Sequence, residues 1–352
     1  RVRFHDPAYY FKKQLFASAL GVIGMYAVAK IDYRRLFALA PWFYAASLAL
    51  STAVLFFGGL QALREFGLIA GTFFLPLLKC LDSQKAGFVL PPRLFGFVQQ
   101  AASALDPELT GEVILFLPWV MEHTKGRSDS LWFMTKAVLC TLPIAALVGS
   151  NNLSTAIILL GICAFLIFIS HPGYLPFFGI GGAGIGFIAV FLMMESYRLE
   201  RLAIWRNPEA YEKGFQTIQG LYAIGSGRIF GCGLGKGLQK LGFVPEAQND
   251  MIFSIICEEG GLFGACLVIA VFAVLIWRLM VISIHARDLG GALIAGGIMG
   301  HIALQVILNI AVVTNTIPNT GITLPFISYG GTSVLFLLGE MGLALSVSRD
   351  TD

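Results

Sequence analysis

Long apolar runs separated by short polar stretches dominate the chain. A helix needs about 20 apolar residues to cross a hydrocarbon core about 30 Å thick. By this criterion the pattern predicts nine membrane spans, at residues 14–31, 36–57, 107–122, 131–149, 153–170, 174–195, 255–282, 290–313 and 331–348. The run at 66–80 is shorter and contains Pro76, so we do not count it. We therefore expect an all-α polytopic membrane protein whose residues 1–352 form one integral domain.

One polar stretch near the C-terminus is broken by proline and glycine. It covers residues 315–333, called the broken segment below, and its chain-bending residues are Pro318, Gly321, Pro325, Gly330 and Gly331. Such backbone cannot pair all its N–H and C=O groups within a helix. At membrane depth it is tolerated only where protein or a water-filled cavity surrounds it. We therefore predict that the broken segment shapes a functional cavity at one face of the membrane.

Composition agrees with a membrane protein and excludes some functions. Hydrophobic residues make up 57% of the chain and charged residues 13%, with a mean hydropathy of +0.77. The net charge of +3 is too small and too dispersed to indicate nucleic acid binding. Histidine and cysteine show no metal-ligand spacing, so no metal site is predicted. Because the chain starts at Arg1 rather than Met, we expect it to be incomplete at the N-terminus.

Basic residues gather in four connections between the runs. Short cytoplasmic connections usually carry an excess of Lys and Arg, and alternation through nine spans places these four on one face. They are residues 32–35, 123–127, 278–287 and the tail at Arg349. The outer face then receives residues 1–13, 58–106, 150–152, 196–254 and 314–330. The longest polar loop and the broken segment are therefore expected on the same side.

The loop at 196–254 combines cations with glycine. Arg201, Arg228 and Lys236 are the cations that we expect to face an anionic group such as a pyrophosphate. Glycine lets backbone N–H groups approach such an anion closely. A flexible surface loop explains the same composition equally well.

Acidic and amide residues near or inside the last runs have two interpretations each. Asp250 precedes an apolar run, so it is a helix N-cap, a general base whose basicity desolvation raises, or both. A helical step of eight residues would stack Glu258 on the same face, as a cavity-lining residue or as a group that forms a structural hydrogen bond between helices. Gln305, Asn309 and Glu340 are expected to form hydrogen bonds between helices.

Several motifs in order resemble one family. They are Gln216–Gln219 with Tyr222–Gly227, Gly233–Gly235, Pro245–Phe253 and Leu324–Ser333. Together they are similar to the SEDS family (shape, elongation, division and sporulation), which includes FtsW, RodA and SpoVE. The resemblance covers residues 107 to 349. It is strongest to the cell-division members of clostridial Gram-positive bacteria.

The resemblance implies a fold and a function. The fold is a ten-helix bundle whose first helix is missing here, with a large extracellular loop between helices 7 and 8. The family's catalytic acidic residue falls on Asp250, its Arg before the loop on Arg201, and its later Glu on Glu258. We assign substrate contacts to Arg201, Arg228, Lys236, Gln248, Glu258, Ser328 and Tyr329.

This chain departs from the family pattern before residue 112. Only Glu108 of a family Glu–Lys pair is kept, because Gly111 stands at the Lys position. Residues 58–106 are longer than the family pattern and lack its Gly-Ala-x-Arg-Trp segment. An insertion or a reading-frame error would explain them.

These observations predict a peptidoglycan glycosyltransferase. By the resemblance it polymerises lipid II at the outer face of the bacterial plasma membrane, at the division septum. Its partners would be a class B penicillin-binding transpeptidase and other division proteins. No cofactor is evident, although a divalent cation (Mg²⁺ or Mn²⁺) could assist at the pyrophosphate. The alternatives are a lipid II flippase and a non-catalytic scaffold of the division complex.

Overall fold

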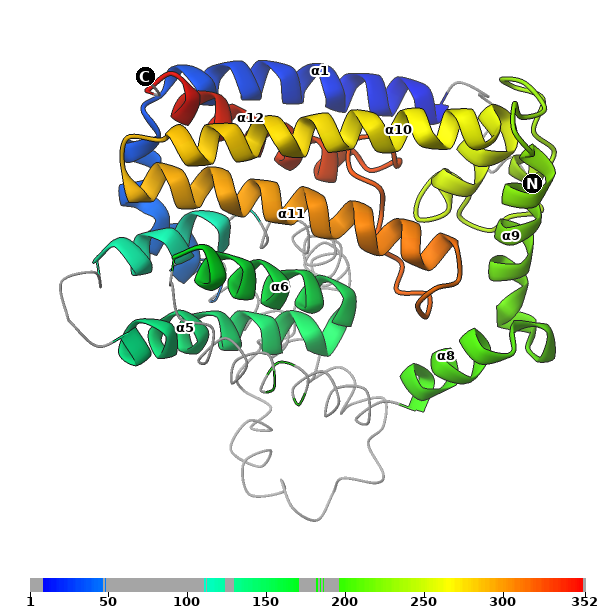
Figure 1. Ribbon diagram of the computed structural model, residues 1–352, viewed down its shortest axis with the longest axis horizontal. Helices are drawn as coiled ribbons and strands as arrows, with labels where there is room; N and C mark the ends of the chain where they lie inside the picture. The colour runs from blue at the N-terminus through cyan, green and yellow to red at the C-terminus, as the bar shows by residue number, and fades with distance from the viewer. Residues whose placement is uncertain are drawn as a thin grey trace, which may run out of the picture.

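Helices make up the architecture of the protein (Figure 1). The computed structural model describes residues 9–46, 48, 111, 113–123, 130–170, 182, 184, 186 and 196–350. Within these residues the elements are helices, and no β-strand occurs. The longer ones are α1 (Tyr9–Lys30), α5 (Ser130–Asn151), α6 (Leu153–Ser170), α10 (Ile252–His285), α11 (Leu289–Val313) and α12 (Gly331–Ser348). Two further apolar helices cover Tyr33–Ala46 and Val113–His123.

The described helices agree with the apolar runs that they cover. Four of them are long and apolar enough to cross a membrane, namely α6, α10, α11 and α12. The helices Phe11–Lys30 and Tyr33–Ala46 pass the same test as a pair bent by 111°. This bend separates the predicted spans 14–31 and 36–57. The predicted span 174–195 and the segment 58–106 lie outside the described residues.

Helix α11 forms the centre of the bundle. It packs on α6 at one side and on α10 at the other, while α1 packs along α12. Its buried residues include Leu293, Ile294, Ile298 and Ile302, which join one core with Ile162 and other residues of α6. Burial on both sides explains why this run is apolar without a clear polar face.

Small residues let α1 and α12 approach closely, as is common between membrane helices. A Cβ atom built on Gly342 of α12 would lie 2.7 Å from the carbonyl oxygen of Met25 in α1. Any larger residue at this position would push the two helices apart.

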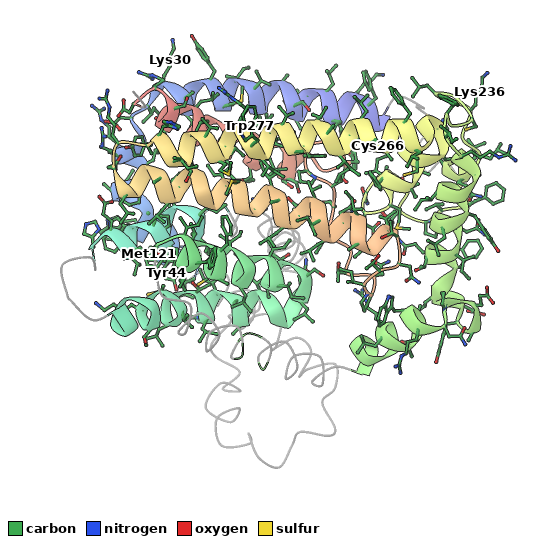
Figure 2. The ribbon with its side chains drawn as sticks, viewed as in Figure 1. Lys30, Tyr44, Met121, Lys236, Cys266 and Trp277 are labelled. Atoms are coloured by element: carbon green, nitrogen blue, oxygen red, sulfur yellow. The ribbon has the colours of Figure 1, made fainter. Side chains whose placement is uncertain are left out.

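The described residues of the four basic connections lie at one end of the bundle, as their charge predicted. Arg34 pairs with Asp288 at 3.6 Å and with Asp350 at 3.0 Å, which joins three of them. Glu122, beside the fourth, lies next to Gly290 at the start of α11. Figure 2 shows Lys30 at this end and Lys236 at the opposite end. The sidedness rule assigns the first end to the cytoplasm.

Helix α10 is broken at Gly261. This residue has φ 64° and ψ −163°, a conformation that glycine adopts readily and other residues rarely do. The 24 residues after it are enough for about 36 Å of helix, which matches a membrane span. The turn and the short helical part before Gly261 therefore belong to the outer end of the bundle.

Candidate active site

The polar loop at 196–254 is folded rather than irregular. It contains α8 (Ser196–Arg206), α9 (Phe215–Gly227) and three short 3₁₀ turns: η1 (Pro208–Ala210), η2 (Glu212–Gly214) and η3 (Gln239–Leu241). In Figure 1, α9 runs across the end of the bundle, at a steep angle to α10 and α11. The loop thus provides a folded cap at the outer end of the membrane helices.

The residues 248–250, called the acidic turn below, are joined to the broken segment. The backbone N–H of Tyr329 donates to the carbonyl of Gln248 at 2.8 Å. The hydroxyl of Ser328 donates to the carbonyl of Asn249 at 2.7 Å and accepts from the N–H of Leu324 at 2.8 Å. Two segments about 80 residues apart in sequence therefore form one unit, as the predicted cavity requires.

Asn309 of α11 also holds the acidic turn and the broken segment, from the side of the membrane helices. Its Nδ2 donates to the carbonyl of Asp250 at 2.9 Å and to the carbonyl of Ile322 at 2.7 Å. The side chain is completely buried. We had expected Asn309 to link two helices, and this was wrong. It instead satisfies two irregular segments that otherwise would leave buried carbonyls unpaired.

Asp250 is buried at the centre of this arrangement, with 8% of its surface exposed. Its two carboxylate oxygens accept from Nε2 of Gln216, at 3.4 and 3.3 Å. The residue at the N-cap position of α10 is Met251, and no side-chain hydrogen bond caps this helix. The capping interpretation of Asp250 is therefore wrong.

The environment makes Asp250 a stronger base than an ordinary aspartate. Burial is the main cause that raises the pKa of its carboxyl to about 6. The charge of Glu246 contributes to the rise, whereas hydrogen bonds from the backbone N–H groups of Asp250 and Met251 and from Gln216 oppose it. A general base is most effective when its pKa lies near the working pH. The side chain therefore has the basicity that proton abstraction from a hydroxyl near neutral pH needs.

We expect the rate of lipid II polymerisation, the reaction that the sequence predicts, to rise with pH through about 6. Below the pKa of about 6 Asp250 holds a proton, so the rate should fall about tenfold for each pH unit. Glu246→Gln should move the midpoint to lower pH, and Gln216→Leu should move it to higher pH. A rate profile from pH 4.5 to 8 measures all three. Equal profiles for the three proteins would contradict this origin of the pKa.

The raised pKa of Asp250 also makes the stability of the fold depend on pH. Because the folded protein holds this proton more tightly than the unfolded chain, the ionised carboxylate destabilises the fold. This penalty is absent below about pH 4 and fully present above about pH 6.

Glu258 and Glu259 hold residues 228–241, called the glycine loop below. The carboxylate of Glu258, only 4% exposed, accepts from the backbone N–H groups of Leu238 and Gln239, the former at 2.8 Å. Glu259 accepts from Lys240 and from the N–H of Gly235. Stacking of Glu258 below Asp250 was predicted from a continuous helix, but α10 begins at Ile252, after Asp250. Glu258 is thus committed to the loop, and its predicted substrate contact stays a prediction.

The three predicted cations lie on two different elements. Arg201 of α8 donates to the carbonyl of Asn319 at 3.1 Å, so it holds the broken segment. Arg228 and Lys236 lie in the glycine loop with exposed side chains. Arg228 has φ 49°, an unusual conformation for a residue other than glycine, of the kind that often marks a functional position. Within the described residues, no hydrogen bond or ion pair joins these cations to Asp250.

The broken segment is a meeting point of several elements. The Trp205 indole of α8 donates to the carbonyl of Asn315 at 3.0 Å. The Ser154 hydroxyl of α6 donates to the carbonyl of Thr320, and the N–H of Gly330 donates to Gln14 of α1 at 3.3 Å. Gly321 has φ 72°, and Pro318 and Pro325 precede and follow it. These partners satisfy the irregular backbone that lipid could not.

The remaining predictions concern an interhelical contact, the residues near 108–111 and metal ligands. Glu340 pairs with His301 across α11 and α12 at 2.9 Å, which confirms it as an interhelical contact. Gly111 lies against Glu340, and Glu108 lies outside the described residues. The described part of the chain contains no group of three His, Cys, Asp or Glu that could hold a metal ion.

Gln216 is the site residue that the sequence assignment missed. It belonged to one of the motifs that resemble the family but received no role of its own. Its partner Asp250 is 34 residues away, and only the packing of α9 against α10 brings them together.

Together, fold and site define an α-helical integral membrane protein with a buried aspartate in the acidic turn at the outer end of its bundle. A family model described as a cell cycle protein, covering FtsW, RodA and SpoVE, matches residues 111–352. Stage V sporulation protein E of Bacillus subtilis is 32% identical and aligns over 99% of this chain and 89% of its own. The probable peptidoglycan glycosyltransferase FtsW of Trichlorobacter lovleyi is 31% identical over 98% of this chain and 85% of its own. The chain therefore belongs to the SEDS family.

Solved structures confirm the fold. A chain of a peptidoglycan synthase complex that coordinates polymerisation and crosslinking matches with a TM-score of 0.69 and 24% identity, over 98% of this chain and 90% of its own. The rod shape determining protein RodA of Thermus thermophilus matches with a TM-score of 0.61 and 24% identity, over 98% and 89%. The SEDS-type bundle is thus confirmed, and the clostridial likeness stays a prediction.

Proposed function

We propose that the chain is a peptidoglycan glycosyltransferase that polymerises lipid II at the outer face of the bacterial plasma membrane. The observation that carries the proposal is the acidic turn, in which Asp250 is buried, raised in pKa and fixed to the broken segment. Family membership and the names of the relatives support the reaction type. The septum is the expected location, because a cell cycle family model matches the chain.

Asp250 would act as the general base. It takes the proton of the acceptor 4-hydroxyl, whose oxygen attacks the anomeric carbon of the lipid-linked donor. The new glycosidic bond forms as the bond to the pyrophosphate breaks, so undecaprenyl pyrophosphate leaves and the anomeric centre inverts. Asp250 then releases the proton to solvent.

Gln216 is the group that an acceptor sugar would displace. Its hydrogen bonds to Asp250, at 3.4 and 3.3 Å, lie at the long end of the usual range for N–H···O contacts. An acceptor hydroxyl could therefore replace them at a small cost, and the amide would then be free to hold the sugar. Gln248 is exposed at the rim of the same turn and Tyr329 is half-buried, which suits their proposed contacts with the substrate.

Charge that develops on the pyrophosphate would be stabilised by cations of the loop. Arg228 and Lys236 have exposed side chains on the glycine loop, whose position Glu258 and Glu259 fix. Electrostatic stabilisation of this kind is often the largest contribution to catalysis. Mg²⁺ usually binds one or two carboxylates together with substrate phosphates. A divalent cation at the pyrophosphate stays a prediction.

A class B penicillin-binding transpeptidase is the proposed partner, together with other division proteins. The structural match to a complex that polymerises and crosslinks peptidoglycan supports this kind of assembly. Helix α10 offers an apolar surface for a partner helix or lipid, with Leu262, Leu267, Val271, Val274 and Trp277 exposed along it. Figure 2 shows Trp277 and Cys266 on this helix.

One experiment separates the enzyme from its alternatives. The purified chain with its transpeptidase and labelled lipid II should produce glycan polymer on a gel. Lipid II reaching the far side of vesicles without polymer would instead indicate a flippase. If neither polymer nor translocation is observed, the non-catalytic scaffold is the interpretation that remains.

A further inference from the structure

A cavity of about 620 Å³ lies between α10 and α12, at the end of the bundle opposite Asp250. Most of its wall is apolar, and its polar groups come from Arg278, His285 and Ser348. The residues that line it are Leu275, Arg278, Leu279, Val281, Ile282, His285, Met341, Ala344, Leu345 and Ser348. Its volume lies in the range of sites for small molecules and is too small for a helix of a partner protein.

Arg278 is an unusual component of this wall. It precedes His285, the last residue of α10, by seven residues, which corresponds to a depth of about 10 Å from the helix end. A cation inside a membrane segment normally faces a partner. Within the described residues, no ion pair or hydrogen bond satisfies its guanidinium, whereas nearby Arg34 pairs with Asp350 and Arg349 donates to the carbonyl of Ala29.

The surroundings decide which anion can reach Arg278. Exposed apolar side chains of Val274, Trp277, Met280 and Ile284 flank the cavity on α10, so its approach lies through lipid rather than water. The basic connections at this end assign it to the cytoplasmic leaflet, which is rich in anionic lipid. A soluble anion could not cross such a surface, but a lipid phosphate is already there.

We propose that this cavity binds one anionic phospholipid of the cytoplasmic leaflet. An acyl chain lies along Leu275, Leu279 and Met341. The guanidinium of Arg278 extends toward the membrane surface and binds the phosphate, which its planar set of donors fits well. His285 and Ser348 lie at the headgroup end. The proposal does not depend on the glycosyltransferase activity, since the site lies at the other end of the bundle.

Native mass spectrometry of the detergent-purified, delipidated full chain tests the proposal. Phosphatidylglycerol, phosphatidylcholine and undecaprenyl phosphate are titrated separately. We expect one phosphatidylglycerol to bind more tightly than either of the others, and Arg278→Gln to weaken it about tenfold, as expected for one lost charge-assisted contact. Arg35→Gln removes the same charge from the same end, outside the cavity wall, and should leave binding unchanged.

A second variant covers the case in which Arg278→Gln does not fold. Leu345→Trp fills the cavity from its exposed side without changing charge, and should also abolish tight binding. An equal loss of phosphatidylglycerol binding in Arg278→Gln and Arg35→Gln would overturn the proposal. It would show that the lipid is attracted by the positive charge of this end in general and not by the cavity. Unchanged binding in Leu345→Trp, or phosphatidylcholine or undecaprenyl phosphate binding as tightly as phosphatidylglycerol, would overturn it as well.

Discussion

Replacing Asp250 by asparagine is expected to lower the rate of lipid II polymerisation by about 10²- to 10⁴-fold, the usual contribution of a general base. Asparagine has nearly the same shape, so the turn should keep the backbone hydrogen bonds from Asn309, Ser328 and Tyr329. Only the proton-accepting carboxylate is lost. Polymer formation from labelled lipid II, in the presence of the transpeptidase partner, measures the effect.

A matched variant controls for the loss of a negative charge at the outer end. Glu209→Gln changes an exposed acidic residue of η1 and should keep the native rate. Asp250→Asn should also unfold at nearly the native temperature or slightly above it, because the native carboxylate is destabilised by burial. Polymerisation by Asp250→Asn at the rate of Glu209→Gln would remove Asp250 from its proposed role.

Apolar patterning predicted much of the fold because membrane helices must be both long and apolar. The predicted run 331–348 coincides with α12, and 290–313 differs from α11 by one residue. Loop charge also placed the basic connections at one end, where Arg34 now joins two of them to the tail. The extent of α10 was less accurate, because hydropathy alone does not reveal that its helix begins at Ile252 and breaks at Gly261.

The site was predictable where a residue type is chemically unusual in its position. Asp250 before an apolar run and the proline- and glycine-rich broken segment were both identified in this way. The contacts between them were not, because they depend on backbone groups. A carbonyl such as that of Asn249, which accepts from Ser328, leaves no trace in the side-chain pattern. The loop contacts of Glu258 were not predictable for a related reason, since its partners are backbone N–H groups of the glycine loop.

Asn309→Leu should be the most damaging substitution outside the catalytic carboxylate. Leucine has a similar volume but no donor, so the buried carbonyls of Asp250 and Ile322 would both lose their partner. Each such loss costs about 1–3 kcal/mol. We expect a clear fall in the temperature of unfolding of the detergent-solubilised protein. Because the acidic turn and the broken segment would lose the side chain that fixes both of them to α11, polymerisation should fall about 10²-fold, as a displacement of about 1 Å can cause.

Gln305→Leu provides the comparison for this effect. Gln305 stands one helical turn before Asn309 on α11, and its buried Oε1 has no hydrogen-bond partner among the described residues. Removing it should therefore leave stability and activity near their native values. If both leucine variants lost stability and activity equally, the effect would belong to helix packing in general. A loss confined to Asn309→Leu would show that one amide on a membrane helix positions the catalytic turn above it.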